Sequence, residues 1–204
     1  MQRAANPAES EALQKRKEAL VETLRSRFAG MDRAALRAIP TIRAYEDHYK
    51  RFDKTYHVRL QLESILFGHK PISAGPALVE AMFVAEVDSM LLTAAHDLDF
   101  VRLPLVVDAA SGNESYTLMR GIAQAPKAGD MMISDQDGIL SSIIYGPDSR
   151  TRLRAETTNA VFTVYGPAGI SAEAIGAHLD QIGQNIKLFA PGARIALSGI
   201  LPAR

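Results

Sequence analysis

The spacing of the apolar residues changes near residue 96, and this change constrains the fold more than any other feature. Before it, apolar residues recur at helical spacing. After it, short runs of β-prone residues alternate with turn dipeptides. Helices followed mainly by strands are typical of an α+β domain, in which N-terminal helices precede a mixed or antiparallel sheet packed with helices. We therefore expect that fold class.

The first half of the chain predicts a series of helices. Asn6, Pro7 and Glu9 fit the start of a first helix that ends near Gly30. Further helices are expected over residues 32–38, 40–51 and 54–67. Residues 76–93 are apolar on most sides of a helix, which is typical of a central, buried helix.

The second half predicts strands at residues 103–109, 116–120, 131–134, 139–145 and 160–165. Asp137-Gly138, between two of these runs, indicates a hairpin. A helix is expected after Ser171, with Pro191-Gly192 ending it, and a last strand is expected over residues 193–200.

Composition and absent motifs exclude several classes of protein. The 204 residues include no cysteine, so disulfides, thiolate zinc sites and cysteine nucleophiles are excluded. The G-x-S-x-G elbow, the Walker loop, the G-x-G-x-x-G turn and the H-E-x-x-H helix are also absent. No uncharged apolar run approaches the length of a membrane span, so we expect a cytoplasmic protein without a membrane partner.

The five histidines, at positions 48, 57, 69, 96 and 178, show no pairing at metal-ligand spacing, so we expect neither a metal nor a cofactor. His48 and His57 are expected on a solvated helix surface, and His178 outside the apolar stripe of its helix. His96 leaves the buried helix together with Asp97 and Asp99. It could bind a substrate or move a proton there, or simply stabilise a helix end.

The segment Tyr145-Gly146-Pro147-Asp148-Ser149-Arg150-Thr151-Arg152 follows a strand, where loops often carry binding groups. Arg150, Arg152 and Arg154 alternate, so an extended backbone would turn them to one side, toward phosphates; the alternative is an ordinary surface turn. The overall charge is zero, yet residues 1–70 hold 14 Lys and Arg against 9 Asp and Glu. This excess indicates either a solvated helical surface or a modest phosphate-facing patch.

Several short motifs occur in a recognisable order over residues 40–190: Leu78-Val79-Glu80, Ala95-His96-Asp97-Leu98-Asp99, Ala110-Ser111-Gly112-Asn113-Glu114, Pro126-Lys127-Ala128-Gly129-Asp130 and Asp135-Gln136-Asp137-Gly138. In this order and spacing the chain resembles a free-standing B3/B4 domain, the module found in the beta subunit of bacterial phenylalanyl-tRNA synthetase. The resemblance implies residues 40–204 as that domain and residues 1–39 as a helical extension.

The resemblance implies a proofreading compartment for mischarged aminoacyl-tRNA. His96 and Asp148 would be the catalytic pair, and Glu114, Tyr145, Arg150 and Arg152 would bind substrate or RNA. Three departures from the family pattern bear on the chemistry: Gly75 replaces an arginine, Phe83 replaces an asparagine, and the chain has no tryptophan.

Three functions follow from these observations. The first is hydrolysis, in trans, of an ester on a mischarged tRNA. The second is a non-catalytic module that binds an amino acid or an RNA end, which the missing arginine and tryptophans favour. The third is an adaptor whose amphipathic stretch over residues 7–28 docks on a partner protein. The oligomeric state is not predicted.

Overall fold

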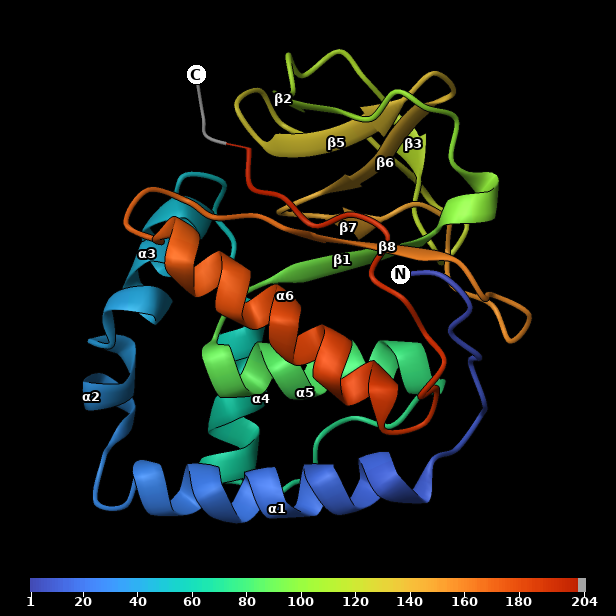
Figure 1. Cartoon of the computed structure of the whole chain (residues 1–204). Coiled ribbons are helices and arrows are strands. Elements are labelled where there is room, and N and C mark those ends of the chain that lie inside the picture. The colour runs from blue at the N-terminus through green and yellow to red at the C-terminus, as the bar shows by residue number, and fades with distance from the viewer. Residues whose placement is uncertain (202–204) are drawn as a thin grey trace.

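The helix α5 (Ala77–Ser89) is the centre of the computed structural model, which describes residues 1–201. Leu78, Ala81, Val84 and Val87 on this helix have no exposed surface. Figure 1 shows α1 (Glu11–Arg27) on one side of α5 and α6 (Ala172–Lys187) on the other, with the sheets beyond. An apolar helix with neighbours on several sides loses little surface to water, which confirms the expected central helix.

The cap of the helix α1 lies four residues after the predicted cap, Asn6. Ser10 caps it by accepting a hydrogen bond from the Leu13 N–H. Asn6 caps a different helix instead, because its Oδ1 accepts from the Leu78 N–H at 2.9 Å. The prediction that Asn6 starts the first helix was therefore wrong: its polar side chain satisfies α5, which a local pattern could not show.

The apolar side of α1 is occupied within the chain. Leu13, Leu20 and Leu24 are fully buried in the same core cluster as Leu78 and Ile186. Arg16 and Arg27 on α1 also pair with Asp88 on α5, at 3.2 and 2.8 Å. These leucines are therefore not free to dock on a partner, while the division of the chain at residue 39 remains a prediction.

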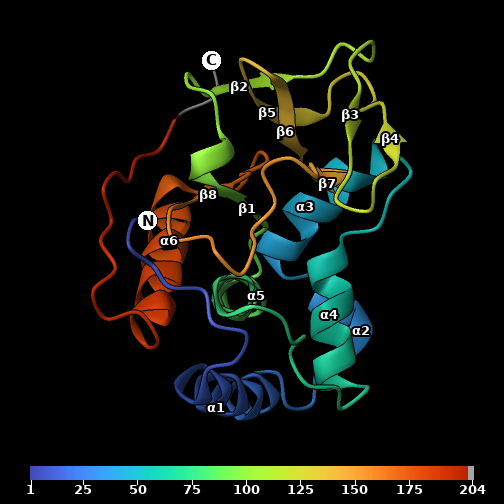
Figure 2. The ribbon, with the colours of Figure 1, turned by 90° about the vertical axis from the view of Figure 1, so that its right-hand side faces the viewer.

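Three shorter helices form one side of the molecule: α2 (Arg33–Arg37), α3 (Pro40–Lys50) and α4 (His57–Leu66) (Figure 2). Asp32 caps α2 with its side chain, and Pro40 occupies the first turn of α3, where its missing N–H costs nothing. All three helices fall where the sequence predicts them.

The strands form three separate antiparallel groups. β1 (Thr93–Asp97) pairs with β8 (Ala160–Val164). The four-stranded sheet has the order β2 (Val106–Ala109), β5 (Met131–Asp135), β6 (Gly138–Ser142) and β7 (Gly146–Pro147). β3 (Tyr116–Thr117) pairs with β4 (Ala123–Gln124), and the short 3-10 helix η1 (Leu98–Phe100) follows β1. Helices combined with antiparallel sheets confirm the α+β class.

The expected hairpin joins β5 to β6, with Asp135 facing Gly138 across the turn. Gly138 has φ +125°, a value that a side chain would make costly. The strand expected over residues 193–200 was wrong, because that segment runs alongside the body and pairs only through Arg194 with Gln2. A β-prone segment forms a strand only when the edge of another strand lies beside it. Residues 193–200 meet only the short stretch at Gln2.

Two histidines expected at the surface are buried. His178 on α6 is 1% exposed, and its ring nitrogens lie 2.7 Å from Ser89 Oγ and 2.6 Å from Thr93 Oγ1. Burial lowers the pKa of His178 to about 4. His48 is 8% exposed and packs on Phe52 at 5.3 Å between ring centroids. The His178 prediction was wrong because the packing of α6 on α5 is long-range information. The His48 prediction was wrong because the aromatic ring of Phe52, one turn further along the chain, covers the imidazole.

Among residues 1–201, no helix has both the length and the apolar surface that a bilayer crossing demands.

Candidate functional site

His96 lies in the middle of strand β1, facing Val161 of β8 across the ladder. The sequence placed it at the end of the central helix, but that helix stops at Ser89 and the chain has already become a strand by Thr93. Met90, with φ 62°, makes the turn between them. His96 has no exposed surface at all. The predicted junction is therefore a buried strand.

Both ring nitrogens of His96 are hydrogen-bonded. Nδ1 lies 2.8 Å from Thr151 Oγ1, and Nε2 lies 3.1 Å from Ser141 Oγ. The Thr151 hydroxyl donates to Asp148 Oδ1, so it must accept from His96, which places the proton on Nδ1. His96 Nε2 then accepts from Ser141, whose oxygen lies 2.5 Å from the Tyr165 hydroxyl. The chain of hydrogen bonds runs in one direction, from Tyr165 to Asp148.

The electrostatics of His96 agree with this direction. Burial, assisted by the positive charge of Arg150, lowers the pKa of His96 to about 4. The imidazole is therefore neutral at pH 7, with one donor and one acceptor, as the hydrogen bonds require.

Asp148 and Arg150 extend this network toward the surface. Asp148 accepts from both the N–H and the hydroxyl of Thr151, and burial raises the pKa of its carboxyl. Arg150 donates hydrogen bonds to Asp135 from two nitrogens, at 2.8 and 3.0 Å, and its Nε lies 3.6 Å from Asp148. Two of the residues assigned to catalysis and one assigned to RNA are therefore brought together, and their polar groups already bond one another.

We name these six side chains the His96 network: His96, Ser141, Asp148, Arg150, Thr151 and Tyr165. Ser141 and Thr151 have no exposed surface, Asp148 and Tyr165 are buried, and only Arg150 reaches the surface. A fully bonded buried network rigidifies the strands that carry it. In this conformation it holds β1, β6 and the 148–151 loop together and presents no free group to a substrate.

Tyr145 lies in an open cleft instead. The cleft has a volume of about 360 Å³ and is lined by Lys54, Leu118, Met119, Arg120, Ile144, Tyr145 and Pro147. Lys54, from the loop between α3 and α4, lies over the Tyr145 ring with its nitrogen 5.6 Å from the centroid. We call this the Tyr145 cleft. It combines an aromatic face, apolar walls and two cations.

A buried carboxylate, Asp130, lies in the loop before β5, near the turn that carries Tyr145. Both of its oxygens lack a hydrogen-bond partner in the described chain, and the residue is fully buried. Burial raises its pKa to about 6, although the Ser142 side chain and the Ile144 backbone act to lower it. An unpaired buried carboxylate is costly, so Asp130 is a buried acid with spare bonding capacity.

The remaining two predicted residues, Glu114 and Arg152, bond backbone groups of their own loops. Glu114 accepts hydrogen bonds from the N–H groups of Ser111 and Gly112, which lower its pKa to about 2. Arg152 donates to the carbonyl of Ser149 and is exposed. The structure shows no hydrogen bond or ion pair from either residue to the His96 network.

Four important residues were missed by the sequence analysis: Lys54, Asp130, Ser141 and Thr151. Thr151 lies in the segment 145–152 that the sequence singles out, but its role was not predicted, although a side-chain acceptor three residues before a threonine often bonds that threonine's N–H in a loop. Asp130 stood in the sequence only as the last residue of the motif 126–130, and Lys54 gave no signal, because the role of each depends on the fold. Within residues 1–201, no three His, Asp or Glu side chains converge as metal ligands.

The comparisons with known proteins give a similarity to solved structures but no match to a family model or to a curated protein. No protein-family model matches the sequence, and no curated protein matches it. Among solved structures, the chain is similar to an N-terminal fragment of the phenylalanyl-tRNA synthetase beta-subunit from Pyrococcus horikoshii, with a TM-score of 0.48 and 14% identity. The match covers 57% of this chain and 42% of that one, so the chain spans less than half of the fragment. A similarity at this level does not indicate what the chain binds.

Proposed function

We propose that the protein binds the 3′ end of an RNA in the Tyr145 cleft, either bare or carrying an esterified amino acid. The observation that carries this proposal is the pairing of the Tyr145 ring with Lys54 in a cleft with apolar walls. A base or an aromatic amino acid stacks on the ring. Stacking of one base on an aromatic side chain contributes roughly 1–3 kcal/mol and tolerates any base.

The cations of the cleft suit the phosphates of the same ligand. Lys54 and Arg120 line the cleft, whereas none of the residues that line it is acidic. The Lys54 ammonium makes no hydrogen bond or ion pair within residues 1–201, so it has N–H groups available for a phosphate. RNA ends and aminoacyl esters combine an aromatic group with a nearby phosphate, and the cleft offers partners for both.

Hydrolysis of the ester in trans is a second candidate, and one observation favours it. Ser141 Oγ and His96 Nε2 lie 3.1 Å apart, in the relation of a hydroxyl to a general base, and Thr151 links the same ring to Asp148. Both side chains are fully buried. Turnover would therefore require the β6–β7 turn to open, whereas binding requires no movement.

The test measures binding and turnover on the same RNAs. A panel of correctly and incorrectly charged tRNAs is incubated with the protein, and the free amino acid released is measured. Affinity for an uncharged RNA hairpin with a single-stranded 3′ end is then measured by fluorescence anisotropy. We expect binding that weakens in Tyr145→Ala and Lys54→Met, with the exposed Lys70→Met as the matched control.

Three outcomes separate the candidates. Binding without release of amino acid supports the binding module. Release from one mischarged tRNA, lost in Ser141→Ala while that variant keeps its melting temperature, supports the deacylase. Equal affinities for Tyr145→Ala, Lys54→Met and the wild type would refute the cleft as the binding site.

A further inference from the structure

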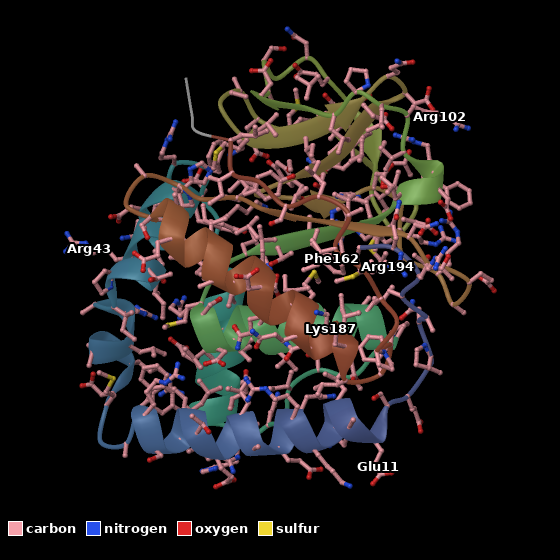
Figure 3. The ribbon with its side chains drawn as sticks, viewed as in Figure 1. Glu11, Arg43, Arg102, Phe162, Lys187 and Arg194 are labelled. Atoms are coloured by element: carbon pink, nitrogen blue, oxygen red, sulfur yellow. The ribbon has the colours of Figure 1, made fainter. Side chains whose placement is uncertain are left out.

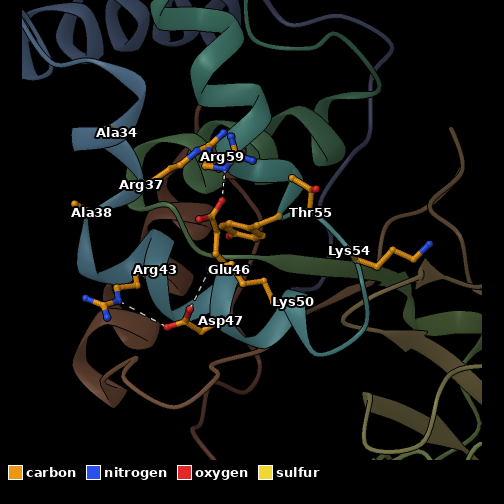
Figure 4. A pocket seen from close by; sticks show the side chains of 11 residues that line it. Ala34, Arg37, Ala38, Arg43, Glu46, Asp47, Lys50, Lys54, Thr55 and Arg59 are labelled. Carbon is orange, nitrogen blue, oxygen red and sulfur yellow. Dashed lines mark ion pairs between the residues drawn. The ribbon is translucent and has the colours of Figure 1, made fainter.

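A second hollow lies between α2, α3 and α4, with a volume of about 600 Å³ (Figure 4). Five of the residues that line it are cations: Arg37, Arg43, Lys50, Lys54 and Arg59. Only two are carboxylates, Glu46 and Asp47. We call this hollow the α3 groove. Its cations belong to the basic first part of the chain.

Some of these charges are already balanced. Arg59 lies between Glu46 and Glu63, with only 5% of its side chain exposed, so its charge is used inside the protein. Arg37 lies 3.9 Å from the same Glu63. The charges of these two arginines and two glutamates largely cancel.

The charges on the rim are not balanced. Asp47 is shared between Arg43, at 3.8 Å, and Lys50, at 3.7 Å, so one carboxylate faces two cations. The side chains of Arg43 and Lys50 are 75% and 71% exposed, and Figure 3 shows Arg43 projecting from the edge of the molecule. Exposed pairs of this kind contribute little to stability, so both cations remain available to an anion.

The rim leads to the Tyr145 cleft. Positions 43, 47 and 50 lie on one side of α3, because they are separated by four and three residues. Lys54 follows the helix and lines both the groove and the cleft. Figure 4 shows Lys54 extending away from the groove, and its nitrogen lies over the Tyr145 ring. The cations therefore form one path from the outer end of α3 to the aromatic ring.

We infer that the α3 groove binds the phosphodiester backbone of the RNA whose terminal nucleotide occupies the Tyr145 cleft, with Arg43, Lys50 and Lys54 as the phosphate contacts. This inference rests on the proposed function and adds a second site to it. The path from groove to cleft favours a single strand over a compact anion, since a mononucleotide would fill only the cleft.

The test compares a short and a long ligand on the same variants. The probes are adenosine monophosphate and a labelled single-stranded RNA of about seven nucleotides. In Arg43→Gln/Lys50→Gln, we expect about tenfold weaker binding of the oligonucleotide at low salt. Its plot of log affinity against log salt should flatten by roughly 1.4, because each lost contact on a single strand removes about 0.7. Adenosine monophosphate should bind as it does to the wild type.

A change of opposite sign sharpens this test. Asp47→Asn removes the carboxylate that competes with phosphate for Arg43 and Lys50, so the oligonucleotide should bind several-fold more tightly and with a steeper salt dependence. Lys15→Gln is the matched control for the loss of cations in Arg43→Gln/Lys50→Gln. Lys15 is 73% exposed and pairs with Glu11 in a similar i,i+4 arrangement, but it lies on α1.

The two proposals fail in different ways. If the groove variants bind the oligonucleotide as Lys15→Gln does, while Tyr145→Ala loses both ligands, the groove is refuted and the cleft stands. If the groove variants weaken the oligonucleotide but Tyr145→Ala changes neither ligand, the cleft is refuted and the groove stands as an RNA site. If no variant and no wild-type protein binds RNA, both are refuted.

Discussion

The His96 network and the Tyr145 cleft differ in whether their polar groups are already satisfied. In the network, His96 uses both ring nitrogens, and Thr151 and Ser141 bond it on either side. In the cleft, the Lys54 nitrogen lies over the Tyr145 ring, and no hydrogen bond or ion pair within residues 1–201 occupies it. The same resemblance assigned function to both regions, but only the second has bonding capacity left for a ligand.

This difference separates residues that hold the structure from residues that are free to bind. A buried polar group with all its partners contributes to stability and resists replacement, whereas an exposed cation and an aromatic face cost little to maintain. Asp130 belongs to neither group, because it is buried like the network and unpartnered like the cleft. The predictions below test this division, beginning with the largest effect.

His96→Ala should reduce the free energy of unfolding by about 3 kcal/mol, because the change removes one hydrogen-bond partner from each of Thr151 and Ser141 and opens a cavity at β1. Urea unfolding measures the loss. The control is His69→Asn, at an exposed position with φ 51° that asparagine tolerates, which should change stability by a few tenths of a kcal/mol. A loss below about 1 kcal/mol in His96→Ala, together with lost RNA binding, would place His96 in the binding site instead.

Asp130→Asn should stabilise the protein by roughly 2 kcal/mol near pH 7.5. Because the pKa of this carboxyl is raised from 3.8 to about 6, the folded state holds the proton more tightly than the unfolded state. The wild type therefore loses stability as the pH rises from about 4 to about 6, and then no more from this group. The variant should lack that part of the pH dependence, which urea unfolding at several pH values will measure.

Glu86 must be separated from Asp130 in that experiment. Burial raises the pKa of Glu86 to about 8, so its destabilising effect continues to develop up to about pH 8. Glu86→Gln, which can still accept from the Thr93 N–H, should remove the slope between pH 6 and pH 8 and its own share of the slope between about 4.5 and 6, where the contribution of Asp130 remains. If both variants keep the full slope, neither carboxyl is its source.

Tyr145→Ala should weaken binding of adenosine monophosphate by about tenfold, from the lost stacking, while the midpoint of urea unfolding changes little because the residue is only partly buried. Tyr145→Phe keeps the ring and should bind as the wild type does. Loss of stability in Tyr145→Ala comparable to that of His96→Ala would remove the distinction between the two regions.

Arg150→Lys should have the smallest effect, a loss of about 1 kcal/mol in stability, because lysine cannot make the two-nitrogen contact with Asp135. RNA affinity should remain unchanged, since this cation is already paired. A reduced salt dependence of RNA binding in this variant would instead return Arg150 to the RNA-binding residues, where the sequence placed it.

The sequence by itself determined the elements whose signals are local. Asp32 and Ser171 cap helices that begin where the sequence predicts them, Gly138 follows the two-residue turn of the hairpin, and α5 carries the apolar surface of a central helix. Capping, positive φ and burial on all sides of a helix depend on residues within a few positions, so a single chain is enough to predict them.

The tertiary structure decided the character of the site. Thr93–Asp97 has no strand pattern of its own and becomes β1 only because β8 supplies a neighbouring edge more than sixty residues later in the chain. His96 and His178 are buried by elements distant in sequence, and Lys54 reaches Tyr145 only because α3 and α4 pack beside the β6–β7 turn. Whether each of these side chains is buried, and which group it contacts, depends on two segments that are far apart in the sequence. The residue types were therefore visible in the sequence, but which of them remained free to bind was decided by packing.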